Sequence, residues 1–320
     1  MQRSTKAVIS GRFTALVSWP RLDHPTDLIG VSAEESRPAM SNDDRIADPA
    51  LNQNGENMGT VATPVLSRLL ADGFTRYSSE SFLSRVEHDD PGMLLKKLSD
   101  AFTELPADPY GRDANRYRRY GRAVYVPWEH TLMWTPPVDD PAAGPVTVYY
   151  QGTHNPEHAG EHRRFAAVPA EVQANELLRQ IILFDAAEAA QSEELRTGLV
   201  HVGVHFVKLA VDTAEDEAVS SPNELHQDGE PFTFAHLISR DNVTGGVNVI
   251  APPRCAGLRP DEVAGELLQA QFTLESPLDS YAVHDPQVSH YVSPVRRGPE
   301  SRRGERCVLL VDFTPYVPQI

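Results

Sequence analysis

Cysteines and long apolar runs are scarce in this sequence. Only two cysteines occur among 320 residues, Cys255 and Cys307, too few for a disulfide framework and too far apart for a zinc-binding pair. A reducing cytoplasm is therefore the expected location. The chain has no apolar run of about 18 residues, so no membrane-spanning helix is expected. Arg12 interrupts the apolar stretch that begins at Ala7, so no signal peptide is expected either.

Positive charge is also in short supply. Lysine and arginine together number 29 against 45 aspartates and glutamates, which gives a net charge of −16. Nucleic acids and anionic membranes attract basic surfaces, so neither is an expected partner. Hydrophobic residues make up 40% of the chain and charged residues 23%, values typical of a globular protein. A chain of this length can bury a core without disulfides or metal staples.

The first 60 residues differ in composition from the rest. Asp, Asn, Pro and Gly cluster from Asp23 to Gly59 without lasting periodicity, which predicts a poorly ordered segment over residues 1–60. Residues 61–320 are predicted to form a single domain, with a helical N-terminal part over 61–195 and a jelly-roll core over about 115–320. Helical spacing of apolar residues predicts helices at 64–73, 92–105 and 169–190.

Alternating apolar residues dominate the second half of the chain. Strands are predicted at 122–126, 146–151, 201–211, 233–239, 246–250, 267–274, 280–284, 287–292 and 307–313. Short strands separated by Gly, Pro and Asp, without an alternation of strands and helices, are typical of a sandwich or jelly roll. The predicted fold class is therefore mainly β with flanking helices around a double-stranded β-helix, a cupin-like jelly roll.

The candidate metal centre is centred on His226-Gln-Asp228-Gly229. Side chains two residues apart in an extended segment lie on the same face, so His226 and Asp228 can bind one ion together. Gly229 allows the chain to turn directly after them. With His290 as the third ligand, two imidazoles and one carboxylate leave half of an octahedron open, as non-haem Fe(II) oxygenases require.

His284 and a second His-x-Asp motif are the alternatives to these ligands. His284 is also far enough along the chain, but Asp285-Pro286 follows it and places it at the end of a strand, whereas His290 lies within an alternating segment. A second His-x-Asp motif, His88-Asp89-Asp90, precedes Pro-Gly in a polar stretch. We interpret its side chains as solvated residues at the end of a helix.

Arg306 is the candidate for binding an anionic co-substrate. It opens the last apolar strand, 16 residues after His290. A dicarboxylate that chelates iron at one end needs its far carboxylate held, and a guanidinium can do this with two parallel hydrogen bonds. Four nearby arginines fill a loop with Gly and Pro and are interpreted as solvated charges, namely Arg296, Arg297, Arg302 and Arg303.

These motifs resemble those of a known family. The segments that carry the resemblance are His226–Gly229, Phe234–Gly246, Val288–Pro294, and Arg306 with Asp312-Phe313. Together they are similar to the bacterial 2-oxoglutarate/Fe(II) dioxygenases that hydroxylate free L-amino acids, the L-isoleucine 4-hydroxylases among them, over about residues 115–315. The resemblance implies a double-stranded β-helix, the cofactors Fe(II), 2-oxoglutarate and O2, His226, Asp228 and His290 as iron ligands, and Arg306 as the 2-oxoglutarate ligand.

The function that this resemblance implies is hydroxylation of an unactivated C–H bond in an aliphatic or cyclic amino acid, such as isoleucine, leucine, proline or pipecolic acid. Succinate and CO2 would be released. A zwitterion needs a cation for its carboxylate and an acceptor for its ammonium group; the candidates are Arg118, Arg122, Gln151, Glu230 and His236. A structural role is favoured for His201 and His205, whereas His236 could line the cavity or pack within the sheet.

Several alternatives stay open at this point. One is a cupin-type metal enzyme that does not use 2-oxoglutarate, and another is a non-catalytic jelly-roll binding protein. A third is a dioxygenase that acts on a carrier-bound or larger intermediate of natural-product biosynthesis. The expected partner is a small amino acid, and a homodimer is left open.

Overall fold

The computed structural model describes residues 67–111, 114–150, 152, 158–220 and 222–317. They belong to one compact unit that spans Ala62–Ile320. The segment predicted to be poorly ordered, residues 1–60, lies outside the described residues. Within the described part of the chain, no helix is long and apolar enough to cross a membrane.

A seven-stranded antiparallel sheet is the largest element of the fold. Its strand order is β1-β13-β9-β16-β7-β2-β3. The strands are β1 (Phe74–Tyr77), β13 (Ser280–His284), β9 (Phe232–Asp241), β16 (Gly304–Pro315), β7 (Val200–Val211), β2 (Arg116–Val126) and β3 (Thr131–Trp134). Because successive side chains alternate across a strand, this major sheet has an inner and an outer face.

Two three-stranded sheets lie opposite the inner face of the major sheet. One has the order β10-β15-β8 and the other β12-β11-β14. Their strands are β10 (Val243–Gly245), β15 (Val295–Arg297), β8 (Glu217–Ala218), β12 (Ala270–Thr273), β11 (Val247–Ala251) and β14 (Ser289–Val292). Apolar side chains from the major and the small sheets form shared clusters between them. This arrangement of antiparallel sheets is a jelly roll.

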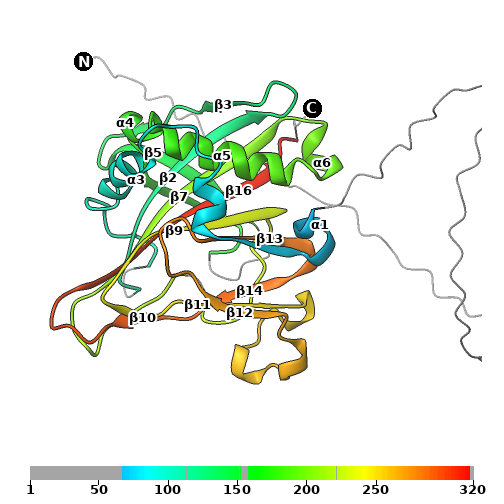
Figure 1. Ribbon diagram of the computed structural model, residues 1–320. Helices are drawn as coiled ribbons and strands as arrows, with labels where there is room; N and C mark the ends of the chain where they lie inside the picture. The colour runs from blue at the N-terminus through cyan, green and yellow to red at the C-terminus, as the bar shows by residue number, and fades with distance from the viewer. Residues whose placement is uncertain (1–66, 112–113, 151, 153–157, 221, 318–320) are drawn as a thin grey trace, which may run out of the picture. The chain divides into compact units, whose positions relative to one another are not determined.

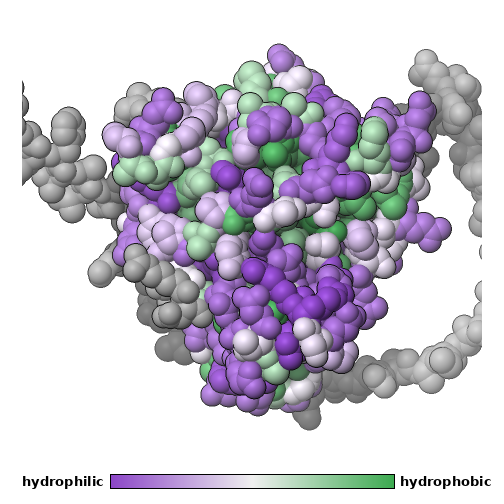
Figure 2. Space-filling model, turned by 90° about the vertical axis from the view of Figure 1, so that its left-hand side faces the viewer, coloured by the Kyte–Doolittle hydropathy of each residue, from purple (hydrophilic) through white to green (hydrophobic). Residues whose placement is uncertain are grey.

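Helices cover the outer face of the major sheet (Figure 1). They are α1 (Arg68–Asp72), α2 (Ser79–Leu83), α3 (Pro91–Asp100), α4 (Ala170–Gln173), α5 (Glu176–Ala189) and α6 (Glu193–Arg196). The largest hydrophobic cluster lies between them and the sheet, with Leu177 and Ile181 of α5 against Phe234 and Phe313 of the strands. Figure 2, which shows the side at the left of Figure 1, has apolar side chains interspersed among hydrophilic ones in its upper part, whereas hydrophilic side chains dominate its lower part.

A further small sheet adjoins strand β2. It has the order β4-β5-β6 and consists of β4 (Val138–Asp140), β5 (Gly144–Tyr150) and β6 (His162–Ala166). Tyr149 and Phe165 of this sheet form an aromatic cluster with Tyr120 of β2. Four short 3-10 helices complete the described elements, namely Pro253–Cys255, Pro260–Glu262, Gly265–Leu267 and Asp285–Gln287.

The predicted fold class, mainly β with flanking helices around a jelly-roll core, is confirmed. Most strand predictions agree in place with the structure. The largest difference is β2, which begins at Arg116 and not at Arg122. The first residues of this strand include arginines at inward positions, which apolar residues normally occupy. The strand therefore begins without the period-two pattern of apolar residues by which strands are predicted.

Two helix predictions differ from the structure, one in where the helix ends and one in its continuity. The helix expected over 92–105 ends at Asp100 and continues only as turns. The helix expected over 169–190 is divided at Asn175, whose side chain accepts a hydrogen bond from the Leu178 backbone N–H at 3.0 Å. This side-chain acceptor caps α5 and explains why a new helix begins there.

A buried polar chain links the helices to the outer face of the sheet. His236 of β9 and Asp185 of α5 are both fully buried, and His236 Nε2 lies 2.8 Å from Asp185 Oδ2. Ser280 Oγ donates to the Leu278 carbonyl and lies 2.7 Å from His236 Nδ1, which therefore donates to it. Burial raises the pKa of Asp185 to about 6, although the His236 imidazole acts in the opposite direction.

We expect the variant Asp185→Asn to gain stability relative to the wild type as the pH rises. The raised pKa means that the carboxyl contributes stability that is fully present below its ordinary value of 3.8 and is lost as the pH rises through about 6. The amide of Asn does not titrate and can donate to His236 Nε2 as a protonated carboxyl does. Urea unfolding at several pH values should show a difference that grows by at most about 1.4 kcal/mol per pH unit and then levels off. A difference independent of pH would contradict this assignment.

Candidate active site

Three potential metal ligands meet at one end of the jelly roll. Their ligand atoms, from His226, Asp228 and His290, all lie within 4.8 Å of one another. Asp228 Oδ1 is 3.6 Å from His226 Nε2, and Asp228 Oδ2 is 3.3 Å from His290 Nε2. Both ring nitrogens of His290 are buried; Nε2 faces the Asp228 carboxylate without an aligned hydrogen bond, and Nδ1 has no hydrogen-bond partner among the described residues. Buried polar atoms without partners are costly unless a ligand satisfies them, so this set fits a metal ion.

The backbone fixes the two imidazoles against each other. His226 precedes β9, His290 lies in β14, and each donates its backbone N–H to the carbonyl of the other at 2.9 Å. Directly opposed residues of an antiparallel pair project to the same side, and the two ring centroids are 4.5 Å apart. The sequence prediction that these residues share one site agrees with this geometry.

Asp285 holds the turn that carries the carboxylate ligand. Its two oxygens accept hydrogen bonds from the backbone N–H groups of Asp228 and Gly229, each at 2.9 Å. Gly229 has a φ of 92°, a conformation that glycine adopts without strain. Burial and the neighbouring Asp228 raise the pKa of Asp285 to about 6. The chain thus turns at Gly229 as predicted, and the turn is stabilised by the hydrogen bonds of Asp285, which lies 56 positions later.

Electrostatics in the triad favour a charged carboxylate next to imidazoles. Burial would raise the pKa of Asp228, but His290 and His226 lower it overall. Burial, followed by His290, lowers the pKa of His226 to about 4, which leaves this imidazole neutral near pH 7. For His290 burial acts downwards, but the Asp228 carboxylate raises its pKa overall. A divalent cation would replace the proton that this carboxylate attracts.

The rejected ligand candidates lie elsewhere. His284 stacks on Phe232, with ring centroids 4.5 Å apart. In the other His-x-Asp motif, Asp90 caps helix α3 by accepting from the Met93 N–H, and His88 Nδ1 accepts from the Asp90 N–H. Both side chains are exposed. The interpretation of this second motif as a solvated helix end is confirmed.

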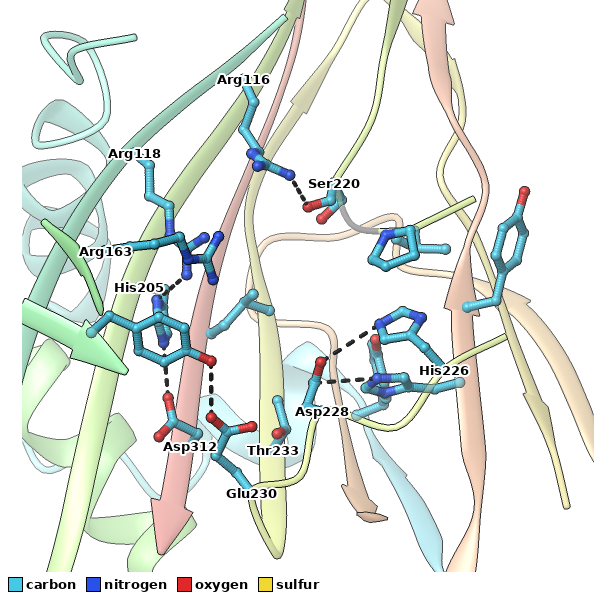
Figure 3. Close-up of a pocket in the computed structure, with 17 residues that line it drawn as sticks. Arg116, Arg118, Arg163, His205, Ser220, His226, Asp228, Glu230, Thr233 and Asp312 are labelled. Atoms are coloured by element: carbon cyan, nitrogen blue, oxygen red, sulfur yellow. Dashed lines mark hydrogen bonds and ion pairs between the residues drawn. The ribbon is translucent and has the colours of Figure 1, made fainter. Parts of the chain in front are cut away.

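A cavity adjoins the triad, and arginines form its opposite wall (Figure 3). Arg116 and Arg118 come from β2, and Arg163 from β6. Arg116 forms a buried ion pair with Asp108, with Nε 2.7 Å from Oδ2. Burial, followed by the two neighbouring arginines, lowers the pKa of Arg118 to about 10. The wall therefore brings three guanidinium groups to one side of the cavity.

Acidic side chains form the base of the same cavity. Glu230 follows the metal-ligand turn and accepts a hydrogen bond from the Tyr149 hydroxyl at 2.9 Å. Burial, with contributions from Asp312 and Asp228, raises the pKa of Glu230 well above its ordinary value. Asp312 of β16 is buried and reaches His205 of β7. The cavity thus has a cationic side and an acidic side, both next to the metal ligands.

Arg306 is buried on the inner face of the major sheet. Only 3% of its surface is exposed, and its Nε has no hydrogen-bond partner in the described part of the chain. Burial lowers its pKa to about 10, with Tyr281 opposing and Arg240 adding to the effect. The surrounding loop arginines instead pair with surface carboxylates, as Arg303 does with Glu305 and Arg302 with Asp241. These loop charges match their interpretation as solvated.

The predicted substrate residues divide into three groups. Arg118 and Glu230 line the cavity. Gln151 lies outside the described residues. Arg122 and His236 are not among the residues that line the cavity, and His236 instead belongs to the buried chain with Asp185. Placing His236 in the cavity conflicts with its position on the outer face of β9.

Several cavity residues were not identified from the sequence. They are Arg116, Tyr149, Arg163, His205, Thr233, Tyr281 and Asp312. For His205 a structural role was favoured. The sequence does contain a signal for its place in the cavity. Non-apolar residues stand at every second position of an otherwise apolar strand, namely His201, Gly203 and His205, and therefore share one face. Buried polar residues in such a row suggest a polar cavity rather than core.

Comparison with known proteins gives consistent matches. The family model for 2OG-Fe dioxygenases matches residues 99–312. An L-isoleucine-4-hydroxylase of Bacillus thuringiensis is 30% identical over 248 residues, which cover 76% of this chain and 90% of the relative. A 3(1)-hydroxy-L-isoleucine 4-dioxygenase of Pantoea ananatis strain AJ13355 is 26% identical over 227 residues, 68% of this chain and 80% of the relative.

The fold also matches solved structures. The crystal structure of a bsmA homolog from Methylobium petroleophilum aligns with a TM-score of 0.63 at 21% identity, covering 80% of this chain and 93% of that one. A jelly roll with two imidazoles and one carboxylate at one end defines the class of mononuclear non-haem metal enzymes. The chain belongs to the 2OG-Fe dioxygenase family, whose enzymes use Fe(II), 2-oxoglutarate and O2. The family decides against a non-catalytic binding protein and against an enzyme without 2-oxoglutarate.

We expect Asp228→Ala to abolish metal binding while Asp90→Ala retains it. Both variants remove the aspartate of a His-x-Asp motif, but only Asp228 lies within reach of two imidazoles. Asp90→Ala should cost about 1 kcal/mol of stability through the lost helix cap. Anaerobic titration with Fe(II), or with Co(II) as a spectroscopic probe, measures the stoichiometry. One metal ion per chain in Asp228→Ala would contradict the ligand set.

Proposed function

We propose that this protein is an Fe(II)- and 2-oxoglutarate-dependent dioxygenase that hydroxylates an unactivated C–H bond of a free L-amino acid. The observation that carries the proposal is a cavity lined by the metal triad, by a cationic wall and by acidic side chains together. The carboxylate of an amino acid needs the cationic wall, its ammonium group needs the acidic side chains, and the C–H bond to be hydroxylated needs to lie near the metal. The named activities of the two relatives, both on isoleucine compounds, support the same substrate class.

His226, Asp228 and His290 are the proposed iron ligands. The fit rests on the buried ring nitrogens of His290, which make no aligned hydrogen bond among the described residues, and on the carboxylate oxygens that face both imidazoles. Iron bound there supplies the coupling of O2 activation to oxidative decarboxylation of 2-oxoglutarate, with succinate and CO2 as co-products. The chain itself contributes the ligands, orients the substrate and excludes water from the site.

Arg306 is the proposed partner of the far carboxylate of 2-oxoglutarate. A buried guanidinium is costly without an anion, and the described residues offer its Nε no partner. The glycine backbone at Gly246 allows close approach, because a Cβ there would lie 3.1 Å from Arg306 Nε. Arg306 shares the inner face of β16 with Leu310 and Asp312, which line the cavity.

We expect Arg306→Gln to raise the KM for 2-oxoglutarate strongly. Loss of a charged hydrogen bond costs about 1.5–3 kcal/mol, or roughly ten- to a hundredfold in binding. Arg303→Gln is the matched control, because Arg303 pairs with Asp212 and Glu305 at the surface. Steady-state succinate formation at varied 2-oxoglutarate measures both. Equal KM values for the two variants would remove Arg306 from the site.

The proposed substrate orientation uses the two sides of the cavity. Arg118 offers a cation for the α-carboxylate, and Glu230, held by Tyr149, offers oxygens to the ammonium group. Leu310 and Val292 provide apolar surface in the same cavity.

Both cysteines are free and buried, which supports a reducing cytoplasm as the location of this enzyme.

Succinate formation with a pool of free amino acids tests the function. Anaerobically purified protein receives Fe(II), ascorbate and 2-oxoglutarate, and O2 is then admitted. We expect succinate to rise with an aliphatic or cyclic amino acid, and a product heavier by one oxygen atom to appear by mass spectrometry. Asp228→Ala should form neither. Succinate from the wild type without stimulation by any amino acid would exclude free amino acids and favour a carrier-bound or larger substrate.

A further inference from the structure

Three polar side chains form a continuous chain across the inner face of the major sheet. They come from neighbouring strands, with Arg118 on β2, His205 on β7 and Asp312 on β16. Arg118 Nη2 is 2.5 Å from His205 Nδ1, and His205 Nε2 is 2.8 Å from Asp312 Oδ2. His205 and Asp312 are 4% and 5% exposed. Figure 3 shows the chain running from the arginine wall towards the base of the cavity.

The chemistry of arginine fixes the direction of every hydrogen bond in this chain. A guanidinium has only donors, so His205 Nδ1 accepts from Arg118 and carries no hydrogen. His205 Nε2 therefore carries the hydrogen and donates it to Asp312. Burial, followed by Arg118, lowers the pKa of His205 to about 4, so the imidazole is neutral and in a single tautomer near pH 7.

The surrounding residues are shaped to hold this imidazole. Gly203 of β7 lies directly opposite Asp312 of β16, and any Cβ at Gly203 would overlap both carboxylate oxygens of Asp312. The absent side chain thus lets Asp312 lie across β7 and reach His205. On its other side the imidazole stacks on Tyr120, with centroids 4.4 Å apart and rings inclined by 27°.

Arg118 has one donor fixed by His205 and another donor without a described partner. His205 occupies Nη2, and the guanidinium carbon lies 4.4 Å above the Phe165 ring. Its Nε is buried and has no hydrogen-bond partner among the described residues. The side chain lines the same cavity as the metal triad, so an anion bound there would meet a guanidinium of fixed orientation.

We propose that His205 and Asp312 are positioning residues that orient Arg118 to bind the α-carboxylate of the amino acid substrate. This inference rests on the proposed function. Neither residue needs to touch the reacting atoms, since both act through Arg118. Asp312 places a negative charge next to His205, at the opposite end of this hydrogen-bonded series from Arg118. The charge offsets part of the electrostatic cost of burying several arginines close together, and the hydrogen bond keeps His205 in the tautomer whose Nδ1 accepts from Arg118.

His205→Phe tests this role. Phenylalanine keeps the stacking on Tyr120 but loses both hydrogen bonds. We expect the KM for the amino acid, with L-isoleucine as the first probe, to rise roughly tenfold or more, while the KM for 2-oxoglutarate stays unchanged. His201→Phe is the matched control, because His201 lies on the same face of the same strand and does not line the cavity; its KM values should equal those of the wild type.

A double-mutant cycle separates positioning from a general structural role. In an Arg118→Gln background, the proposal predicts that adding His205→Phe raises the amino-acid KM no further. Effects that multiply would overturn it, because the two residues would then act independently. Asp312→Asn is nearly isosteric and gives a second test if His205→Phe does not fold. It should raise the same KM in the same direction, and thermal unfolding verifies that each variant is native.

The outcomes distinguish this inference from the proposed function. If no amino acid stimulates the wild type, the proposed function and this inference fail together. If the wild type responds but His205→Phe or a folded Asp312→Asn keeps the wild-type KM for the amino acid, only the positioning role is overturned. A KM increase confined to the amino acid and absent in the Arg118→Gln background supports it.

Discussion

Two reciprocal backbone hydrogen bonds, between His226 and His290, hold the site together. They join the segment that precedes β9 to a strand of the opposite small sheet, so the imidazoles meet only when the jelly roll has closed. Asp285 then fixes the turn that presents Asp228 between them. Each of these contacts involves the backbone and is therefore independent of the metal, which means that the ligands are pre-arranged by the fold.

The inner face of the major sheet carries charge where a jelly roll usually carries apolar side chains. Each buried charge requires compensation, and the arginines differ in how they obtain it. Arg116 has Asp108, and Arg118 has a neutral imidazole backed by Asp312. Arg118 and Arg306 each keep a buried Nε without any described partner. This gradation, from paired to unpaired, separates the arginines that support the cavity from those suited to bind an anionic ligand.

Local patterns were sufficient to predict that the three candidate metal ligands lie together, but not to predict the cavity around them. His226 and Asp228 form a motif, and His290 lies in an alternating strand, so sequence spacing was sufficient. For His236 the sequence analysis left the cavity and the sheet open, although its alternation with Phe232 and Phe234, large apolar residues on the covered outer face, favours packing within the sheet. The pairing of His205 with Asp312 spans 107 positions and depends on the register of β7 and β16, which no local pattern contains. Charged inward residues likewise concealed the start of β2.

The requirement for glycine at position 203 can be checked in the sequences of related enzymes without their structures. Since a Cβ at position 203 and a carboxylate at position 312 would occupy the same space, a relative with an alanine or larger residue there cannot keep the aspartate in this pose. The pair of positions should therefore vary together among related enzymes. Related enzymes with glycine and aspartate at these two positions would be those that orient the arginine through a histidine. Enzymes without this glycine would recognise their substrates by other means.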